Sequence, residues 1–229
     1  NPQNVIEILK INKIKFYETG IEHGTITAII NKKSFEITTL RKDVKTDGRH
    51  AQVEYTDNWL EDASRRDFTI NSIYSDLDGN LFDPFNGKRD LQDGLIKFIG
   101  DPTTRIKEDY LRILRYIRFF LGYSKNQHDK NIIKIIKQNL SGLKQVSKDR
   151  QLQELKKIVL LENFYKINTD KIAKELFLLI FPELKNINRI DKLDNLSQNV
   201  LKGKKFEFVL SLLLIDKSED CDYFIYKYN

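Results

Sequence analysis

The spacing of apolar residues changes near residue 100, and this change limits the folds open to the chain. Before it, three short runs rich in β-branched and aromatic residues predict strands at 15–18, 25–30 and 34–40. From Pro102 onward almost every segment has helical spacing. The expected breaks between these helices are Gly122, 141–142, Asn163, Pro182 and Gly203. The sequence therefore predicts an α+β chain: a head with a small mixed or antiparallel sheet and helices, then an all-helical neck and body.

Shorter signals complete the expected head. They are short helices at 2–10 and 59–64, and a hairpin with strands at 73–77 and 80–83 that turns through Asp78 and Gly79. Residues 41–57 are polar and show no periodicity, so they are predicted to form a mobile loop. The expected domains are the head at 1–100, the neck at 101–160 and the body at 161–229.

Composition excludes several classes of protein. The longest apolar runs, 176–181 and 212–215, are far too short to cross a bilayer, so no membrane partner is expected. The single cysteine, Cys221, excludes an internal disulfide and fits a reducing compartment such as the cytoplasm.

The net charge of +6 is concentrated in one segment. Residues 121–160 hold 9 basic and 3 acidic residues, whereas the segments on either side are neutral. Such a patch is a candidate contact for a phosphate backbone, and the alternative is a solvated lysine-rich helix. The candidate RNA-binding residues are Lys130, Lys134, Lys137 and Lys144, of which the first three share one helical face.

Arginine has a different distribution from lysine. Nine of the 11 arginines lie within residues 41–118, in a chain that otherwise uses 28 lysines for positive charge. The planar guanidinium suits bidentate contacts with phosphate or with a base edge. This arginine-rich region therefore predicts a nucleotide or polyanion site.

Two clusters carry most of these arginines. Residues 61–67 hold five charges, and taken alone they also fit a group of surface ion pairs. In the segment 108–120, polar residues recur every three positions at Asp109, Arg112, Arg115 and Arg118. A parallel apolar row is formed by Leu111, Leu114, Ile117 and Phe120. We expect one helix here, with the apolar row in a core and the arginines facing a cleft, the alternative being an amphipathic helix with a solvated face.

Together the two clusters identify a family resemblance. The chain resembles the class II nucleotidyltransferases, which are the CCA-adding tRNA nucleotidyltransferases and the bacterial poly(A) polymerases. Residues 65–71 (Arg-Arg-Asp-Phe-Thr-Ile-Asn) resemble the ribose-selecting motif, and 108–112 (Glu-Asp-Tyr-Leu-Arg) resemble the amino-acid template for the incoming base. The blocks 83–87 and 90–91 resemble the family segment between them. The head is then expected to be an N-terminally incomplete nucleotidyltransferase head.

The resemblance implies roles for individual residues. The implied nucleotide-binding residues are Arg65, Arg66, Asp67, Asn71, Asp109, Arg112, Arg115 and Arg118. Among them, Arg66, Arg115 and Arg118 would hold triphosphate and ribose, and Asp67 would orient Arg66 or reach the ribose. Residues 41–50 are similar to the flexible loop of CCA-adding members, in which the implied site residues are Arg41, Asp43, Asp47 and Arg49.

The chemistry of base selection can be argued from the template residues themselves. Cytosine and adenine both present an exocyclic amine beside a ring-nitrogen acceptor. The carboxylate of Asp109 can accept from the amine and the guanidinium of Arg112 can donate to the ring nitrogen. Uracil and guanine have the opposite polarity and would leave buried polar groups unpaired, so they are rejected.

One departure from the family pattern concerns the metal. The resemblance implies Mg²⁺ bound by an N-terminal segment with Gly-Gly-x-Val-Arg-Asp and Asp-x-Asp, and neither motif occurs in residues 1–229. Glu36 is a candidate third carboxylate, the alternative being an exposed strand residue, while Asp76 and Asp78 are interpreted as turn residues. The chain starts with Asn1 and holds no methionine, so we expect a piece of a longer or processed protein.

These implications define the expected function. The chain is expected to take part in adding C and A residues to tRNA 3′ ends with CTP and ATP, contacting the tRNA acceptor end. A separate N-terminal chain is an expected partner, since transfer by these residues alone is not expected. The alternatives are a poly(A) polymerase or A-adding relative, and a non-catalytic RNA- or nucleotide-binding remnant of a split gene.

Overall fold

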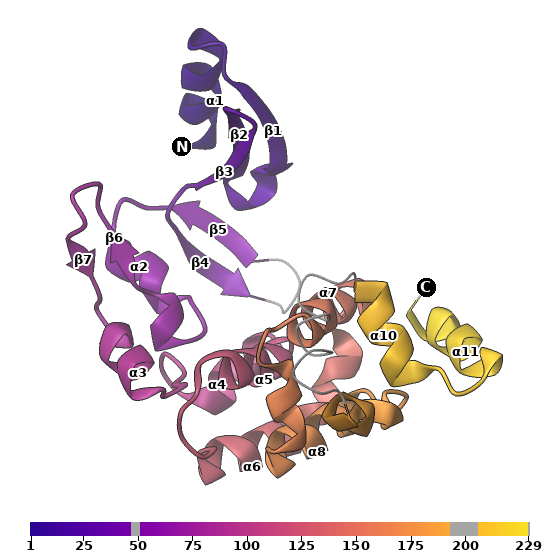
Figure 1. Ribbon diagram of the computed structural model, residues 1–229. Coiled ribbons are helices and arrows are strands. Elements are labelled where there is room, and N and C mark those ends of the chain that lie inside the picture. Colours follow the sequence, from indigo (N-terminus) through magenta and orange to yellow (C-terminus); the bar gives the residue numbers. More distant parts are fainter. Residues whose placement is uncertain (47–50, 193–205, 229) are drawn as a thin grey trace. The chain divides into compact units, whose positions relative to one another are not determined.

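The computed structural model describes residues 1–46, 51–192 and 206–228 (Figure 1). The described chain divides into two compact units. Unit 1 comprises 1–66 and 71–85, and unit 2 comprises 67–70 and 86–229. The functional division into head, neck and body stays a prediction. Within the described part of the chain, no helix has the length and apolar character that a bilayer crossing requires.

Unit 1 begins with a helix packed on a sheet. The elements are α1 (Pro2–Ile11), β1 (Lys15–Gly20), the 3₁₀-helix η1 (Ile21–His23), β2 (Thr25–Ile30) and β3 (Lys33–Thr38). The strands are antiparallel in the order β1-β2-β3. Ile6 and Leu9 of α1 are buried with Ile26 and Ala28 of β2. The predicted helix and three strands are confirmed, each within two residues of its expected ends.

The segment predicted as a loop contains a hairpin instead. Strands β4 (Arg41–Thr46) and β5 (Ala51–Tyr55) pair antiparallel, with Arg41 opposite Tyr55. The prediction was wrong because the backbone pairing of a polar hairpin leaves no apolar alternation in the sequence. Lys42 and Glu54 form a cross-strand ion pair at 3.2 Å. Asp47 and Arg49 lie outside the described residues.

The rest of unit 1 is a short helix and a small hairpin. Helix α2 (Trp59–Ser64) has its predicted bounds, and β6 (Tyr74–Ser75) pairs with β7 (Leu81–Phe82) as predicted. The Asp76 carboxylate accepts bonds from the amides of Asp78 and Asn80 at 2.9 and 2.8 Å. Asp76 and Asp78 are therefore turn residues, as their position in the hairpin indicates.

Unit 2 is helical (Figure 1). Its α-helices are α3 (Gly87–Asp93), α4 (Pro102–Glu108), α5 (Arg112–Tyr123), α6 (Lys130–Asn139), α7 (Lys148–Val159), α8 (Lys171–Ile180), α10 (Phe206–Leu214) and α11 (Ser218–Tyr228). Its 3₁₀-helices are η3 (Leu140–Gln145), η4 (Phe164–Asn168) and η5 (Lys185–Lys192), while η2 (Thr69–Asn71) crosses the boundary between the two units. Helix α5 runs through Gly122, so the break predicted there is one residue early.

Helix α5 lies in the main core. It packs against α4, α7 and α8, and its apolar row is buried as predicted. The four residues of that row are Leu111, Leu114, Ile117 and Phe120. Arg112, Arg115 and Arg118 are thereby held on a helix that is fixed in the core.

Candidate nucleotide-binding site

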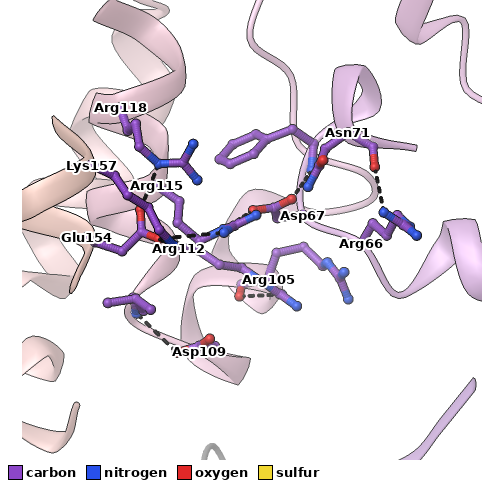
Figure 2. A network of polar contacts seen from close by, with 12 residues as sticks. Arg66, Asp67, Asn71, Arg105, Asp109, Arg112, Arg115, Arg118, Glu154 and Lys157 are labelled. Atoms are coloured by element: carbon purple, nitrogen blue, oxygen red, sulfur yellow. Dashed lines mark hydrogen bonds and ion pairs between the residues drawn. The ribbon is translucent and has the colours of Figure 1, made fainter. Parts of the chain in front are cut away.

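The predicted nucleotide-binding residues belong to both units. Arg65, Arg66 and Asn71 lie in unit 1, whereas Asp67, Asp109, Arg112, Arg115 and Arg118 lie in unit 2. In unit 1, Arg66 follows α2 and its Nη1 donates to the carbonyl oxygen of Asn71 at 3.2 Å (Figure 2). Its guanidinium also stacks 5.0 Å from the ring centre of Tyr74. Arg66 is therefore held in one orientation with about a third of its side chain exposed.

Asp109 occupies a turn rather than a helix. Helix α4 ends at Glu108, Asp109 has an extended backbone (φ −155°, ψ 104°), and α5 begins only at Arg112. The expectation of one continuous helix carrying Asp109, Arg112, Arg115 and Arg118 was therefore wrong. The Asp109 carboxylate accepts from the Leu111 amide at 3.1 Å, and this bond stabilises the turn.

A second contact holds Asp109 from another helix. Nη2 of Arg150 on α7 donates to Oδ2 of Asp109 at 2.7 Å. Tyr110, the next residue, packs over Gly142 of η3, where an added Cβ would come within 2.1 Å of the tyrosine ring. Glycine is thus needed at 142 for this close approach. The turn is fixed by two contacts that sequence spacing does not reveal.

Arg112 is fixed at the start of α5. Its Nη1 donates to Oε2 of Glu108 at 2.6 Å and to the carbonyl oxygen of Arg105 at 2.7 Å. Arg105 itself donates to the same Glu108 oxygen at 2.7 Å. The Arg112 side chain is 13% exposed. The guanidinium is consequently preorganised, without the rotamer freedom of an arginine in solvent.

Arg115 and Arg118 converge on a buried glutamate (Figure 2). Arg118 Nε donates to Glu154 on α7 at 2.8 Å, and Lys157 binds the other oxygen at 2.8 Å. Arg115 binds Asp67 and lies 3.8 Å from Glu154. Burial raises the pKa of Glu154, but the Lys157 hydrogen bond and the Arg118 charge outweigh it, so the pKa lies below its usual value.

Asp67 is placed by the strand-like pairing of its own segment. The amide of Ile99 donates to the Asp67 carbonyl at 3.0 Å, and Phe68 bridges to Phe98 in the core. Burial lowers the pKa of Arg115, but the hydrogen bond and charge of Asp67 prevail and raise it above its usual value. Arg115 therefore stays protonated at neutral pH.

Comparisons with known proteins match part of the chain to one family and find relatives named as CCA-adding enzymes. Residues 1–97 match the family described as the poly A polymerase head domain. The human protein named CCA tRNA nucleotidyltransferase 1, mitochondrial, is 51% identical over 142 residues, covering 61% of this chain and 33% of that protein. The chain is therefore similar to CCA-adding enzymes, and its residues 1–97 are similar to the poly A polymerase head domain. A CCA-adding enzyme of Geobacillus sp. (strain WCH70) is 32% identical over 214 residues, covering 90% of this chain and 52% of that enzyme.

Solved structures of CCA-adding enzymes share the fold. The structure titled apo form II has a TM-score of 0.72 at 22% identity, covering 100% of this chain and 57% of that chain. The Bacillus stearothermophilus CCA-adding enzyme in complex with CTP has a TM-score of 0.62 at 23% identity, covering 86% and 54%. The predicted α+β head with a helical body is confirmed. The chain spans about a third to a half of the length of its curated relatives.

Several residues that shape the site were not among those predicted. They are Asp62, Arg105, Glu108, Arg150 and Glu154. Glu108 stands four positions before Arg112, and Asp62 stands three and four before the arginine pair, which is ion-pair spacing on a helix. Arg150 and Glu154 are far from their partners in sequence, and no local pattern marks them.

The magnesium that the family resemblance implies does not fit the residues described. No group of three or more His, Cys, Asp or Glu side chains that could hold a metal occurs in residues 1–46, 51–192 and 206–228. The carboxylates near the arginines are held by cations, as with Asp109 and Arg150. Glu36 lies exposed on β3 opposite Thr27, and its role as a third carboxylate stays a prediction.

The predicted RNA-binding lysines lie on or beside α6. Lys130, Lys134 and Lys137 are exposed, whereas Ile132, Ile133, Ile135 and Ile136 of the same helix are buried. The three lysines therefore share a solvent face, as their spacing predicts. Lys137 differs from the others because its ammonium binds Glu175 on α8 at 2.6 Å. Lys144, in η3, is also exposed.

Proposed function

We propose that the chain is the nucleotide-selecting and tRNA-binding part of a tRNA nucleotidyltransferase, which adds C and A residues to tRNA 3′ ends. In that reaction the tRNA 3′-hydroxyl attacks the α-phosphate of CTP or ATP and pyrophosphate leaves. The names of the human and Geobacillus relatives support the proposal. A binding-only remnant of a split gene is the alternative against which it is tested.

The observation that carries the proposal is the preorganised pair of Asp109 and Arg112. Both residues are fixed by contacts that do not involve a nucleotide, Asp109 through Arg150 and Arg112 through Glu108. A carboxylate has about four lone-pair sites, so Asp109 can accept an exocyclic amine while it keeps its bond to Arg150. Cytosine and adenine match this acceptor–donor pair, and guanine and uracil do not.

The cluster around Glu154 supports a phosphate-binding role. Its ion pairs join three cations, Arg115, Arg118 and Lys157, to two carboxylates, Asp67 and Glu154, so the positive charges of these five residues are in excess. A triphosphate would add charge-assisted hydrogen bonds to guanidiniums that are already oriented. In unit 1, the oriented Arg66 is proposed to contact ribose or phosphate.

The lysine face of α6 is proposed to contact the tRNA backbone. Lys130 and Lys134 are the main candidates, and Lys144, in the following 3₁₀-helix η3, is a further one. Lys137 would have to exchange Glu175 for a phosphate, so it is expected to contribute less.

We also propose that the protein works in a reducing compartment such as the cytoplasm, although three of the relatives are named as mitochondrial.

No step of the reaction is assigned to Mg²⁺ within this chain, because its described residues do not fit such a site. The proposed contribution of the chain is selection and orientation of the nucleotide. Positioning of this kind is a large part of catalysis in phosphoryl and nucleotidyl transfer. Residues 1–229 alone are nevertheless expected to transfer nucleotides no faster than background, because the metal-binding motifs are not among them.

The test is incorporation of labelled CTP and ATP, with magnesium, into tRNA lacking its terminal C-C-A. The chain is assayed alone and with a separate fragment carrying Gly-Gly-x-Val-Arg-Asp and Asp-x-Asp. We expect two C residues and one A only in the combined reaction, and little incorporation when the chain carries Asp109→Ala. Long runs of A would favour the poly(A) polymerase alternative, and failure to bind either nucleotide or tRNA would contradict the proposal.

A further inference from the structure

Asp62 is a buried acid that does not belong to the predicted nucleotide-binding set. It lies on α2, its side chain is 1% exposed, and its partners Arg41, Arg65, Arg66 and Tyr74 all belong to unit 1. Burying a carboxylate is costly unless cations and hydrogen bonds compensate for the lost water. The groups that bind the Asp62 carboxylate therefore indicate its structural role.

The two carboxylate oxygens of Asp62 serve different partners. Oδ1 accepts from the backbone amide of Arg41 at 3.2 Å and from Nε and Nη2 of Arg65 at 2.9 and 2.5 Å. Oδ2 accepts from Nε and Nη2 of Arg66 at 3.2 and 3.1 Å and from the Tyr74 hydroxyl at 2.7 Å. One oxygen faces the start of strand β4, and the other holds the arginine proposed to contact the nucleotide.

Further bonds reinforce each side. Nε of Arg65 also donates to the carbonyl oxygen of Arg41 at 2.9 Å, so both backbone polar groups of Arg41 are bound to this cluster. The Tyr74 hydroxyl also accepts from Nε of Arg66 at 3.0 Å. Burial and the bond to Asp62 raise the pKa of Tyr74 to about 12, so the hydroxyl keeps the proton that it donates.

The charge of Asp62 is stable at neutral pH. Burial raises its pKa, but the hydrogen bonds from Tyr74 and Arg65 outweigh that effect and hold the pKa below its usual value. Both oxygens are then acceptors. An asparagine has the same shape but offers one acceptor and one donor. It could therefore accept the bonds from Arg41 and Arg65 or those from Arg66 and Tyr74, but not both sets.

We propose that Asp62 is a positioning residue that links the β4–β5 hairpin to Arg66, so that the base of the hairpin and this arginine hold one relative arrangement. The proposal rests on the proposed function for the role of Arg66 at the nucleotide. The link itself is a statement about unit 1 alone. Asp62 itself is not proposed to touch a nucleotide, and its effect on binding passes through Arg66.

The test uses Asp62→Asn, Tyr74→Phe and, as a matched control, Asp57→Asn, an exposed acid of the same unit. NMR would follow hydrogen exchange of the Arg41 amide and of the Arg66 Nε–H, with the β1–β3 amides as internal reference. Equilibrium binding of CTP and ATP would be measured on the same samples.

For Asp62→Asn we expect faster exchange, by tenfold or more, at one or both of the Arg41 amide and the Arg66 Nε–H. The reference amides of the β1–β3 sheet should not change. The dissociation constants for CTP and ATP should both rise about tenfold, because Arg66 contacts a part common to both nucleotides. Asp57→Asn should leave exchange and binding as in the wild type.

Tyr74→Phe keeps the ring and all the Asp62–arginine bonds, so it tests the link even where Asp62→Asn does not fold. It should speed exchange at the Arg66 Nε–H and weaken nucleotide binding a few-fold, while the Arg41 amide stays protected.

Unchanged exchange in both variants would overturn the proposal, as would equal acceleration throughout unit 1, which indicates general destabilisation. Normal nucleotide affinity in a folded Asp62→Asn protein whose Arg66 exchanges faster would overturn it too. A wild-type chain that binds no nucleotide would contradict the proposed function instead, and the exchange pattern alone would then decide for or against the link.

Discussion

Nη2 of Arg150 lies 2.7 Å from Oδ2 of Asp109, although the two residues are 41 positions apart. Arg150 comes from α7, in the helical part of the chain, and Asp109 is the proposed acceptor for the base amine. Under the proposed function, the contact makes base selection depend on α7, which supplies none of the proposed base-reading residues. Changes in α7 would then alter nucleotide preference.

Substituting Arg150 with alanine should weaken binding of CTP and ATP about tenfold, because Asp109 would no longer receive a charge-assisted hydrogen bond of about 1.5–3 kcal/mol. Titration of both nucleotides would measure this. Lys148→Ala, which removes an exposed cation from the same helix, is the control and should bind normally. Equal affinities in all three proteins would show that Arg150 does not position Asp109.

Gly142→Ala should displace Tyr110 and with it the Asp109 turn, since the new Cβ would lie 2.1 Å from the tyrosine ring. Overpacking of this kind costs about 1–3 kcal/mol of unfolding free energy. Chemical denaturation should show lower stability, and CTP titration should show weaker binding. Gly122→Ala is the comparison, because its nearest neighbour is 3.8 Å away and alanine favours a helix. A Gly142→Ala protein as stable as Gly122→Ala would contradict the close approach.

The apolar row of α5 could be predicted from sequence because a buried helix face leaves a period of about 3.6 residues. The break between α4 and α5 could not be predicted in this way. Residues 108–111 contain neither proline nor glycine, and the turn at Asp109 depends on tertiary contacts with Arg150 and Gly142. Spacing alone therefore placed Asp109 on the same helix as Arg112.

The β4–β5 hairpin was missed for a related reason. Its pairing uses backbone hydrogen bonds, and the polar residues Arg41, Lys42 and Asp43 give no sign of a buried face. The arginines of the site were found because their residue type is unusual in a lysine-rich chain. Asp62 was missed as a site residue because an acid near an arginine is common on protein surfaces. Glu154 was missed because it lies 36 positions from its partner Arg118 in the sequence.

Glu154 should give the protein a stability that depends on acid pH. Its pKa is lowered in the folded state, so its contribution is fully present above the unfolded-state value and disappears as pH falls through the folded-state value. Glu154→Gln should lower the free energy of unfolding at pH 7 by about 3 kcal/mol, as breaking a buried ion pair does. The stability of this variant should also fall less steeply than that of the wild type as the pH becomes acid.

Thermal melts between pH values of about 3 and 7 would measure both effects of Glu154→Gln, since an ordinary glutamate titrates in this range and the pKa of Glu154 lies below the ordinary value. Glu162→Gln, at an exposed position shortly after α7, is the control and should follow the wild-type curve. If the melting temperatures of the wild type and Glu154→Gln fall equally steeply towards acid pH, Glu154 does not make the proposed contribution to stability.

The lysine face of α6 should make tRNA binding sensitive to salt. The double variant Lys130→Ala/Lys134→Ala should lower the slope of log affinity against log salt by about 0.7–0.9 for each phosphate that these lysines neutralise. Lys137→Ala should have a smaller effect because of its ion pair with Glu175. Lys171→Ala, at an exposed position on α8, should have none. An unchanged slope in the double variant would remove α6 from the RNA-binding surface.

The central claim is that Asp109 and Arg112 select the base, and equilibrium binding of the four nucleoside triphosphates tests it most directly. The wild-type chain should bind CTP and ATP in preference to GTP and UTP. Asp109→Ala should reduce that preference by about 1–3 kcal/mol, the usual value of one good base-edge contact. Equal affinity of the wild-type chain for all four nucleotides would contradict the claim.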